Sequence, residues 1–166
     1  MKRYLLPVCM VLGAFAFSSL ASEPGKGVAS MEKMKSLVGV WEGKDEQGKT
    51  IRVTYKLVSG GSMLMETIDH DTHKDGMITA YYLDGDAMMM THYCSMGNQP
   101  RMRTEGGDAN SISFTFVDGT NMKLEDPHMH KLTITWTDDS HMMQEWTMQS
   151  EGKDAPPVVF SLERKG

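Results

Sequence analysis

Apolar and polar residues alternate along most of the chain that follows residue 38. Between Thr50 and Leu57 every second residue is apolar, and the segment 130–136 repeats this period of two. Such a period is typical of β-strands that bury one face and expose the other. Dipeptides that favour tight turns, such as Asp84-Gly85, separate the alternating segments. The pattern therefore indicates a succession of short antiparallel strands.

We predict ten such strands from the alternation and the turns. They cover residues 38–45, 49–58, 63–70, 76–83, 87–95, 101–106, 110–117, 129–137, 141–149 and 157–163. A meander of this length hides its edges best by closing into a barrel. The sequence thus predicts an all-β fold, a closed up-and-down antiparallel barrel, with a two-sheet sandwich as the alternative.

A short helix is expected before the first strand. Ser30 is suited to cap it, apolar residues follow at helical spacing, and Gly39 ends it. The preceding residues 22–29 are rich in Gly, Pro and Ser, which predicts a disordered linker. The barrel domain, including its helix, is therefore expected to span residues 30–166.

Residues 1–21 have the pattern of a secretory signal peptide. A positive start, Lys2 and Arg3, precedes an apolar run of about 14 residues and a small-residue end at Ala21. We predict cleavage after Ala21 and export to the periplasm or beyond. The run is shorter than the roughly 20 residues that span a bilayer, which argues against a membrane anchor. Cys9 lies inside the apolar run, away from the cleavage point, which argues against a lipoprotein.

Composition narrows the class of partner. Removing Lys2 and Arg3 takes the net charge from −5 to −7, and an acidic chain without a basic run is not suited to nucleic acid or anionic membranes. No second apolar span follows, so no membrane span is expected in the mature form. Cys94 would be the only remaining cysteine, so an apolar core must hold the domain without a disulfide. The 17 methionines fill core gaps or bind soft metals.

The sequence Gly39-Val40-Trp41-Glu42-Gly43 lies between the expected helix and the meander. This order resembles the calycin-type barrels, which include lipocalins, fatty-acid-binding proteins and nitrobindin-like haem barrels. The chain after residue 21 also resembles bacterial secreted proteins of uncharacterised function with a lipocalin-like domain. The resemblance implies that Trp41 packs across the closed end of the barrel under Arg164, beside Gly39. An indole suits this place because it is a large apolar plug with one polar edge; an ordinary core tryptophan is the alternative.

One departure from this group concerns haem. Nitrobindin-like barrels ligate haem through a histidine near the end of the chain, but residues 157–166 contain no histidine. His141 opens the ninth predicted strand instead. We therefore expect no haem and no other resident cofactor.

The stretch around Cys94 combines several kinds of polar and sulfur-containing side chain. Met90, His92 and Cys94 share one face of a strand. A two- or four-residue turn would bring Arg101 and Arg103 of the next strand onto that face, and a three-residue turn would not. Cysteine is seldom exposed, which favours an inward face. Interior arginines would bind a carboxylate, as fatty-acid-binding barrels do by resemblance; an outward face would leave them in solvent.

His92 and Cys94 also raise the questions of catalysis and of metal binding. Side chains two apart on a strand are about 6.5–7 Å apart, too far for direct proton transfer between nucleophile and base. We therefore predict that the protein is not an enzyme. Met90, His92 and Cys94 are soft ligands suited to copper, with further donors in 128–130 and 141–143. Core-filling methionines with incidental histidines are the alternative.

The leading hypothesis is non-catalytic binding of a small, mostly apolar molecule, acidic if the arginines face inward. Copper binding and a structural domain without a ligand are the alternatives. The predicted ligand-binding residues are His92, Arg101, Arg103, Met90, Cys94, Tyr55, Phe114, Phe116, Trp136 and Trp146.

Overall fold

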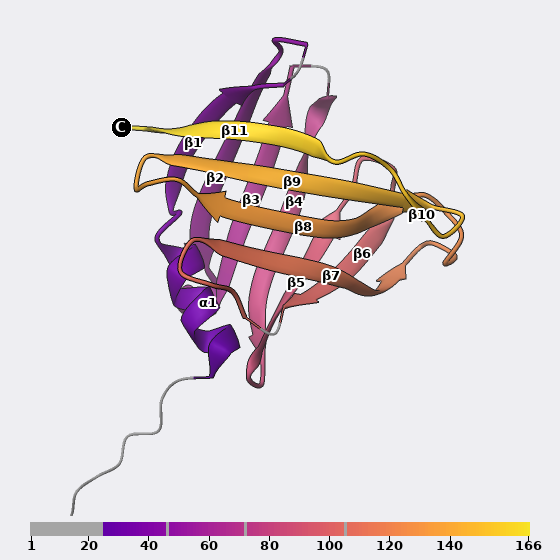
Figure 1. Cartoon of the computed structure of the whole chain (residues 1–166), viewed down its shortest axis with the longest axis horizontal. Coiled ribbons are helices and arrows are strands. Elements are labelled where there is room, and N and C mark those ends of the chain that lie inside the picture. Colours follow the sequence, from indigo (N-terminus) through magenta and orange to yellow (C-terminus); the bar gives the residue numbers. More distant parts are fainter. Residues whose placement is uncertain (1–24, 46, 72, 105) are drawn as a thin grey trace, which may run out of the picture.

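The alternating segments form strands that close into a barrel (Figure 1). The computed structural model describes residues 25–45, 47–71, 73–104 and 106–166. Within these ranges the barrel strands are β1 (Gly39–Lys44), β2 (Thr50–Val58), β3 (Met63–His70), β4 (His73–Asp84), β5 (Ala87–Tyr93), β6 (Gln99–Thr104), β7 (Ser111–Thr120), β8 (His128–Trp136), β9 (His141–Ser150) and β11 (Val158–Lys165). A 3-10 turn, η1 (Ser59–Gly61), and a two-residue strand, β10 (Lys153–Asp154), lie in the connections.

Hydrogen bonding continues around the whole barrel. Consecutive strands pair from β1 to β9, β9 also pairs with β11, and β11 pairs with β1. All these pairings are antiparallel, so the predicted up-and-down barrel is confirmed and the sandwich is wrong. Closure leaves no long unpaired edge among the described strands, which is the property that favoured a barrel from the sequence.

Alternate side chains on the strands point into the barrel, as the period of two predicts. On β2, Ile51, Val53 and Tyr55 are fully buried, whereas Arg52 between them is exposed. The inward residues of the strands and of the helix form one hydrophobic cluster. Burial of each large apolar side chain stabilises the fold by about 1.5–3 kcal/mol, so this interior holds the barrel together.

One end of the barrel is covered by α1 (Lys26–Lys35) (Figure 1). The Gly27 amide donates a hydrogen bond to the Asp86 carbonyl in the β4–β5 turn at 3.0 Å, and Met31 is buried. The helix starts earlier than predicted: Ser30 lies inside it and is buried, so its assignment as the cap was wrong. The prediction of a disordered linker was also wrong for residues 26–29, because they form the first turn of α1. Gly27 lets this turn lie close to the barrel. Residues 22–24 lie outside the described residues.

Trp41 fills the interior next to this covered end. Its side chain is fully buried, and its indole Nε1 donates to the Leu37 carbonyl at 2.8 Å. The Arg164 guanidinium lies 4.2 Å from the centre of the Trp41 ring, the arrangement that the resemblance implied. Arg164 also donates to the Ser36 and Val38 carbonyls at 2.7 and 2.9 Å, so it ties the last strand to the end of the helix.

Gly39 allows this close approach at the start of β1. Its φ angle of +133° is one that residues with a side chain rarely adopt. A Cβ atom there would also lie 3.2 Å from Nη1 of Arg164. The predicted barrel-closing residues therefore lie in contact at one end.

None of the helices in the described part of the chain is both long and apolar enough to span a membrane. The predicted signal peptide, residues 1–21, lies outside the described residues.

Candidate functional site

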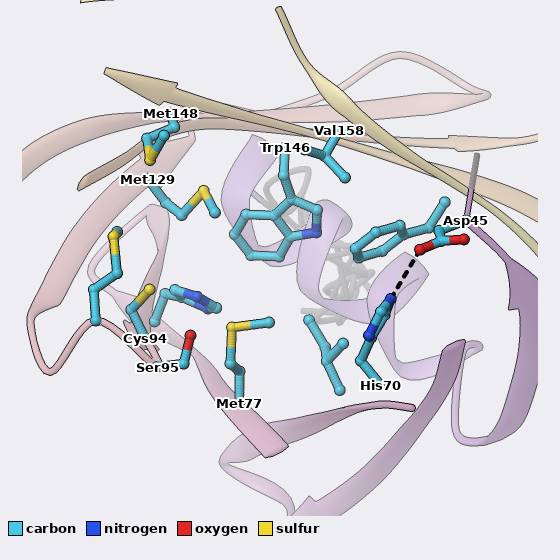
Figure 2. A pocket seen from close by; sticks show the side chains of 13 residues that line it. Asp45, His70, Met77, Cys94, Ser95, Met129, Trp146, Met148 and Val158 are labelled. Atoms are coloured by element: carbon cyan, nitrogen blue, oxygen red, sulfur yellow. Dashed lines mark hydrogen bonds and ion pairs between the residues drawn. The ribbon is translucent and has the colours of Figure 1, made fainter. Parts of the chain in front are cut away.

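A pocket of about 280 Å³ opens at the end of the barrel opposite α1. The helix contacts the β4–β5 turn, whereas the pocket is bordered by the β3–β4 and β5–β6 turns. Successive turns of an up-and-down barrel lie at opposite ends, so the pocket and the helix are at opposite ends. Its lining is mostly apolar and rich in sulfur (Figure 2). The lining residues are Asp45, Ile68, His70, Met77, His92, Cys94, Ser95, Met96, Met129, Trp146, Met148, Val158 and Phe160.

The β5–β6 turn decides which side chains of the following strand face this interior. The Cys94 amide donates to the Asn98 carbonyl at 3.1 Å, and the Gly97 amide donates to the Cys94 carbonyl at 2.9 Å. Three residues, 95–97, therefore form the loop, and Gly97 has the positive φ of +84° that such loops require at their last position. Even-numbered residues of β5 consequently pair with even-numbered residues of β6, for example Met90 with Met102.

The predicted placement of Arg101 and Arg103 was therefore wrong. Both are exposed on the outside of the barrel, while His92 and Cys94 face inward as favoured. Arg101 forms a two-pronged ion pair with Asp118 on β7. The two arginines that were expected to bind a carboxylate ligand thus do not line the pocket.

Four polar side chains form a row across adjacent strands below the pocket. Tyr55 on β2 lies opposite Glu66 on β3, Glu66 lies opposite Thr79 on β4, and Thr79 lies opposite His92 on β5. All four point inward and are essentially inaccessible to solvent. We call Tyr55, Glu66, Thr79 and His92 the polar row.

The Glu66 carboxyl is the acceptor at the centre of a buried network. It accepts hydrogen bonds from the hydroxyls of Tyr55 at 2.7 Å and Tyr81 at 2.9 Å, and from Nε2 of Gln144 at 2.5 Å. The Thr79 hydroxyl, on the residue directly opposite, also lowers the pKa of Glu66. Burial raises the pKa of Glu66 and outweighs these bonds, each of which lowers it. The same burial and the nearby carboxylate raise the pKa values of Tyr55 and Tyr81 well above the ordinary value.

Gln144 and Trp146 close this network from the opposite wall. The indole Nε1 of Trp146 can only donate, and it lies 3.0 Å from Oε1 of Gln144. This fixes the orientation of the amide, so that Nε2 of Gln144 faces Glu66 and the Tyr55 hydroxyl. Hydrogen bonds from Gln144 on β9 thus connect that strand to the polar row across the interior of the barrel.

His92 joins the polar row to the pocket wall. Its Nδ1 lies 3.0 Å from the Thr79 hydroxyl, and its ring packs against the Trp146 ring with centroids 4.8 Å apart. Its second nitrogen, Nε2, is buried and has no hydrogen-bond partner among the residues that the structure describes. Burial lowers the pKa of His92 to about 4, so the imidazole is neutral at pH 7.

The rim of the pocket combines one ion pair with exposed apolar side chains. Nε2 of His70 lies 3.1 Å from Oδ2 of Asp45, and Figure 2 shows this pair at one edge of the opening. Desolvation raises the pKa of Asp45, but hydrogen bonds from the Lys49 amide and from His70 outweigh it, so the pKa is lowered overall. Met96 and Val158 are 47% and 52% exposed. Apolar surface at the mouth therefore continues into the pocket.

The predicted ligand-binding residues are distributed over several parts of the barrel. His92, Cys94 and Trp146 line the pocket, and Tyr55 lies in the polar row. Met90 is fully buried and is not part of the pocket lining. Of these five residues, three therefore line the pocket and two do not.

Three aromatic residues predicted to line the cavity lie outside the pocket lining. Phe114 packs against Tyr81 with ring centroids 5.6 Å apart. Phe116 is partly buried and stacks on His130 at 5.5 Å. Trp136 lies under Lys33 of the helix, whose Nζ is 5.1 Å from the ring. Phe114 and Trp136 belong to the hydrophobic core cluster, and none of the three side chains lines the pocket.

The residues suggested for copper are not all brought together. His92 and Cys94 meet in the pocket, but Met90 does not line it and His141 is exposed beside Asp138. Within the described residues no group of three or more His, Cys, Asp or Glu side chains could hold a metal ion. The pocket instead gathers methionines from three strands and from the β5–β6 loop, namely Met77, Met129, Met148 and Met96.

Sequence reasoning missed Glu66, Thr79 and Gln144. Glu66 occupies an inward position between Leu64 and Ile68 in the period-two pattern, so a polar residue on an apolar face was visible in the sequence. Its partners were not, because they depend on the registers of several hairpins. Comparison with protein-family models gives no match for this chain, and comparison with curated protein sequences gives none either.

Proposed function

We propose that this protein binds a small, mostly apolar, uncharged molecule in the pocket at the open end of the barrel. The observation that carries the proposal is the pocket itself: a cavity of about 280 Å³ with apolar and sulfur-containing walls and an exposed apolar rim at Met96 and Val158. Ligand sites are typically concave and apolar with few convergent polar groups. Methionine walls suit such a role because their flexible side chains adapt to different shapes.

The size of the pocket limits the ligand. Each water molecule takes up about 30 Å³ in the liquid, so the volume corresponds to roughly nine waters. A molecule of on the order of ten non-hydrogen atoms fits this space, for example a substituted benzene ring. A long acyl chain would require the core below the polar row to rearrange.

The charge of the pocket disfavours an acidic ligand. Among the described residues its lining contains no lysine or arginine, and its rim carries Asp45. His92 is neutral at pH 7 because burial lowers its pKa to about 4. A carboxylate would therefore lose its hydration without gaining a cationic partner, which is unfavourable in an apolar site.

Binding without catalysis is the class that these residues support best. His92 lies on β5 and Cys94 directly follows that strand, and the ring of His92 contacts Thr79 and Trp146. A nucleophile–base pair needs direct contact and an orienting third group. The polar row orients His92 from the Nδ1 side, which suits recognition of a ligand.

Binding is tested by titrating the protein with toluene and following amide shifts in two-dimensional NMR spectra. The expected shifts are confined to residues around the pocket and saturate. In the Met77→Trp variant the larger side chain fills the cavity and abolishes them. The matched control is Leu124→Trp, because Leu124 is 64% exposed and away from the pocket. Unchanged binding in Met77→Trp, or shifts scattered over the surface, would contradict the proposal and leave a structural domain without a ligand.

Soft-metal binding is a second candidate because the pocket collects the appropriate atoms. Cys94, the unpartnered Nε2 of His92 and four methionine thioethers border the same cavity. Cu(I) prefers such sulfur and imidazole ligands. A titration with Cu(I) under reducing conditions decides the matter: stoichiometric binding lost in Cys94→Ala supports this candidate, and the absence of binding eliminates it.

We also propose that the chain is a calycin-type barrel that is exported. The Trp41–Arg164 contact beside a short helix supports the first part, and the pattern of residues 1–21 supports the second. Expression of the full chain with separation of the cell fractions tests export. An exported product that begins at Ser22 is expected; a product that keeps residue 1 in the cytoplasm would contradict it.

A further inference from the structure

We propose that the protein has a second ligand site, a groove at the covered end of the barrel that binds a small carboxylate between Trp136 and Lys33. This site goes beyond the proposed function, because it lies at the end of the barrel opposite the apolar pocket. Three observations support it: a buried donor without an acceptor, a lysine without a carboxylate partner, and a fixed guanidinium group in the same wall.

The groove lies between α1, the β8–β9 turn and the last strand. Its volume is about 440 Å³, and its described lining consists of Lys33, Ser36, Trp136, Asp139, Ser140 and Arg164. Two cations and one carboxylate among these side chains give the groove a formal charge of +1. The apolar pocket has no such cationic lining among its described residues.

The buried donor is the indole Nε1 of Trp136. The side chain is 7% exposed, and Nε1 has no hydrogen-bond partner among the described residues. An indole nitrogen can only donate, so the partner that it lacks is an acceptor. Buried polar groups are almost always paired in native proteins. The other two tryptophans follow this rule, because Trp41 donates to the Leu37 carbonyl at 2.8 Å and Trp146 donates to Gln144 at 3.0 Å.

Lys33 supplies a mobile positive charge beside this donor. Its Nζ lies 5.1 Å from the centre of the Trp136 ring, and its side chain is half-buried. In the described part of the chain no carboxylate pairs with it, whereas Lys35 in the same helix pairs with Glu32 at 2.7 Å. The four-carbon stem of a lysine is flexible. The ammonium group can therefore leave the ring and meet an anion at the indole.

Arg164 contributes a second positive charge that is held in place. Three of its five N–H groups donate to the carbonyls of Ser36, Val38 and Asp139, at 2.7, 2.9 and 3.1 Å. Its guanidinium also lies over the Trp41 ring. These partners are neutral, so the charge of Arg164 remains available to attract an anion.

This arrangement selects a carboxylate among small anions. One carboxylate oxygen accepts a hydrogen bond from Nε1 of Trp136, and the other pairs with the ammonium group of Lys33. Chloride is a single atom and does not bridge the two donors. A formal charge of +1 also suits a monoanion better than the dianionic form of phosphate. A hydrogen bond with a charged partner corresponds to about 10-fold or more in affinity.

Binding is measured by titrating the protein with sodium acetate at pH 7 and following the three indole ¹H–¹⁵N signals by NMR. Trp136→Phe assigns the signal of Trp136. That signal should move downfield and saturate, because its N–H gains an acceptor. The signals of Trp41 and Trp146 should stay in place, since both groups already donate inside the protein.

A pair of lysine variants tests the role of the charge. Lys33→Gln removes the charge in the groove and should weaken acetate binding by about 10-fold. Lys35→Gln is the matched control, because it removes the same charge from the same helix outside the groove lining. Its affinity for acetate should equal that of the wild type.

Parallel titrations with sodium chloride and sodium phosphate at matched ionic strength test the ligand class. Weaker responses of the Trp136 signal to both salts than to acetate are expected. Equal responses to all three salts, an unmoved Trp136 signal with acetate, or equal acetate affinities in Lys33→Gln and the wild type would each overturn the proposal. None of these results bears on toluene binding at the other end of the barrel, so the two proposals fail independently.

Discussion

The strongest quantitative prediction concerns the pH dependence of stability caused by His92. Its ring is 1% exposed, and burial lowers its pKa from 6.5 to about 4. In the unfolded chain the imidazole accepts a proton below pH 6.5, whereas in the folded protein it stays neutral down to about pH 4. Between these values the unfolded state binds more protons, so acidification favours unfolding.

The magnitude follows from the pKa shift. One unit of pKa corresponds to about 1.4 kcal/mol, so the free energy of unfolding should fall by that amount per pH unit in this window. The accumulated loss should be about 3 kcal/mol when pH 4 is reached, and it should not grow further below that pH. Above pH 6.5 the term is absent because the ring is neutral in both states.

The assay is urea unfolding followed by circular dichroism at fixed pH values between 4 and 7.5. The wild type is compared with His92→Phe, in which this term is missing. Other titrating groups, such as Glu66 and Asp45, contribute to both proteins and cancel in the difference. Met77→Leu is the control, because it changes the same pocket without removing a titrating group, so its difference from wild type should not vary with pH.

A difference between wild type and His92→Phe that stays constant from pH 7.5 to pH 4 would refute this reasoning. It would mean that His92 is protonated in the folded protein, and hence that the interior offers it an anionic partner or water.

Three further predictions concern other parts of the barrel. Trp41→Ala should lower the free energy of unfolding by about 3–5 kcal/mol, the usual effect of removing a buried aromatic ring, and urea unfolding measures it. Burial raises the pKa of Glu66, so the folded protein binds a proton there more readily than the unfolded chain. The free energy of unfolding of the wild type should therefore fall as the pH rises from 4.5 through the folded pKa. The stability of Glu66→Gln relative to wild type should increase over this range, which urea unfolding measures. The double variant Arg101→Gln, Arg103→Gln should bind toluene with unchanged affinity in the NMR titration, since both side chains lie outside the barrel; a loss of affinity would restore the interior placement.

The barrel could be predicted from the sequence because its two signals are local. Apolar alternation reports which strands have one buried face, and turn residues report where strands end. The strand bounds consequently agree with the structure to within a few residues. The start of the helix was predicted too late because residues 22–29 are rich in Gly, Pro and Ser, a composition that also indicates flexibility. Gly27 is one of these residues, but in the structure it lets the helix approach Asp86.

The site was less predictable because it depends on registers between strands. The polar row exists only if three successive strand pairs place Tyr55, Glu66, Thr79 and His92 opposite one another. No single segment contains that information. The same limit explains the error at Arg101: the inward face of β5 was chosen correctly, but the number of residues in the following loop was not.

That loop has a consequence for how such a barrel could change. With three residues between Cys94 and Asn98, two guanidinium groups stay on the outer wall. Deletion or insertion of one residue there would turn the outward side chains of β6 inward and the inward ones outward, which would bring the positive charges of Arg101 and Arg103 into the interior. A single-codon change in a surface turn, with every strand residue retained, could thus convert a neutral cavity into one that attracts anions.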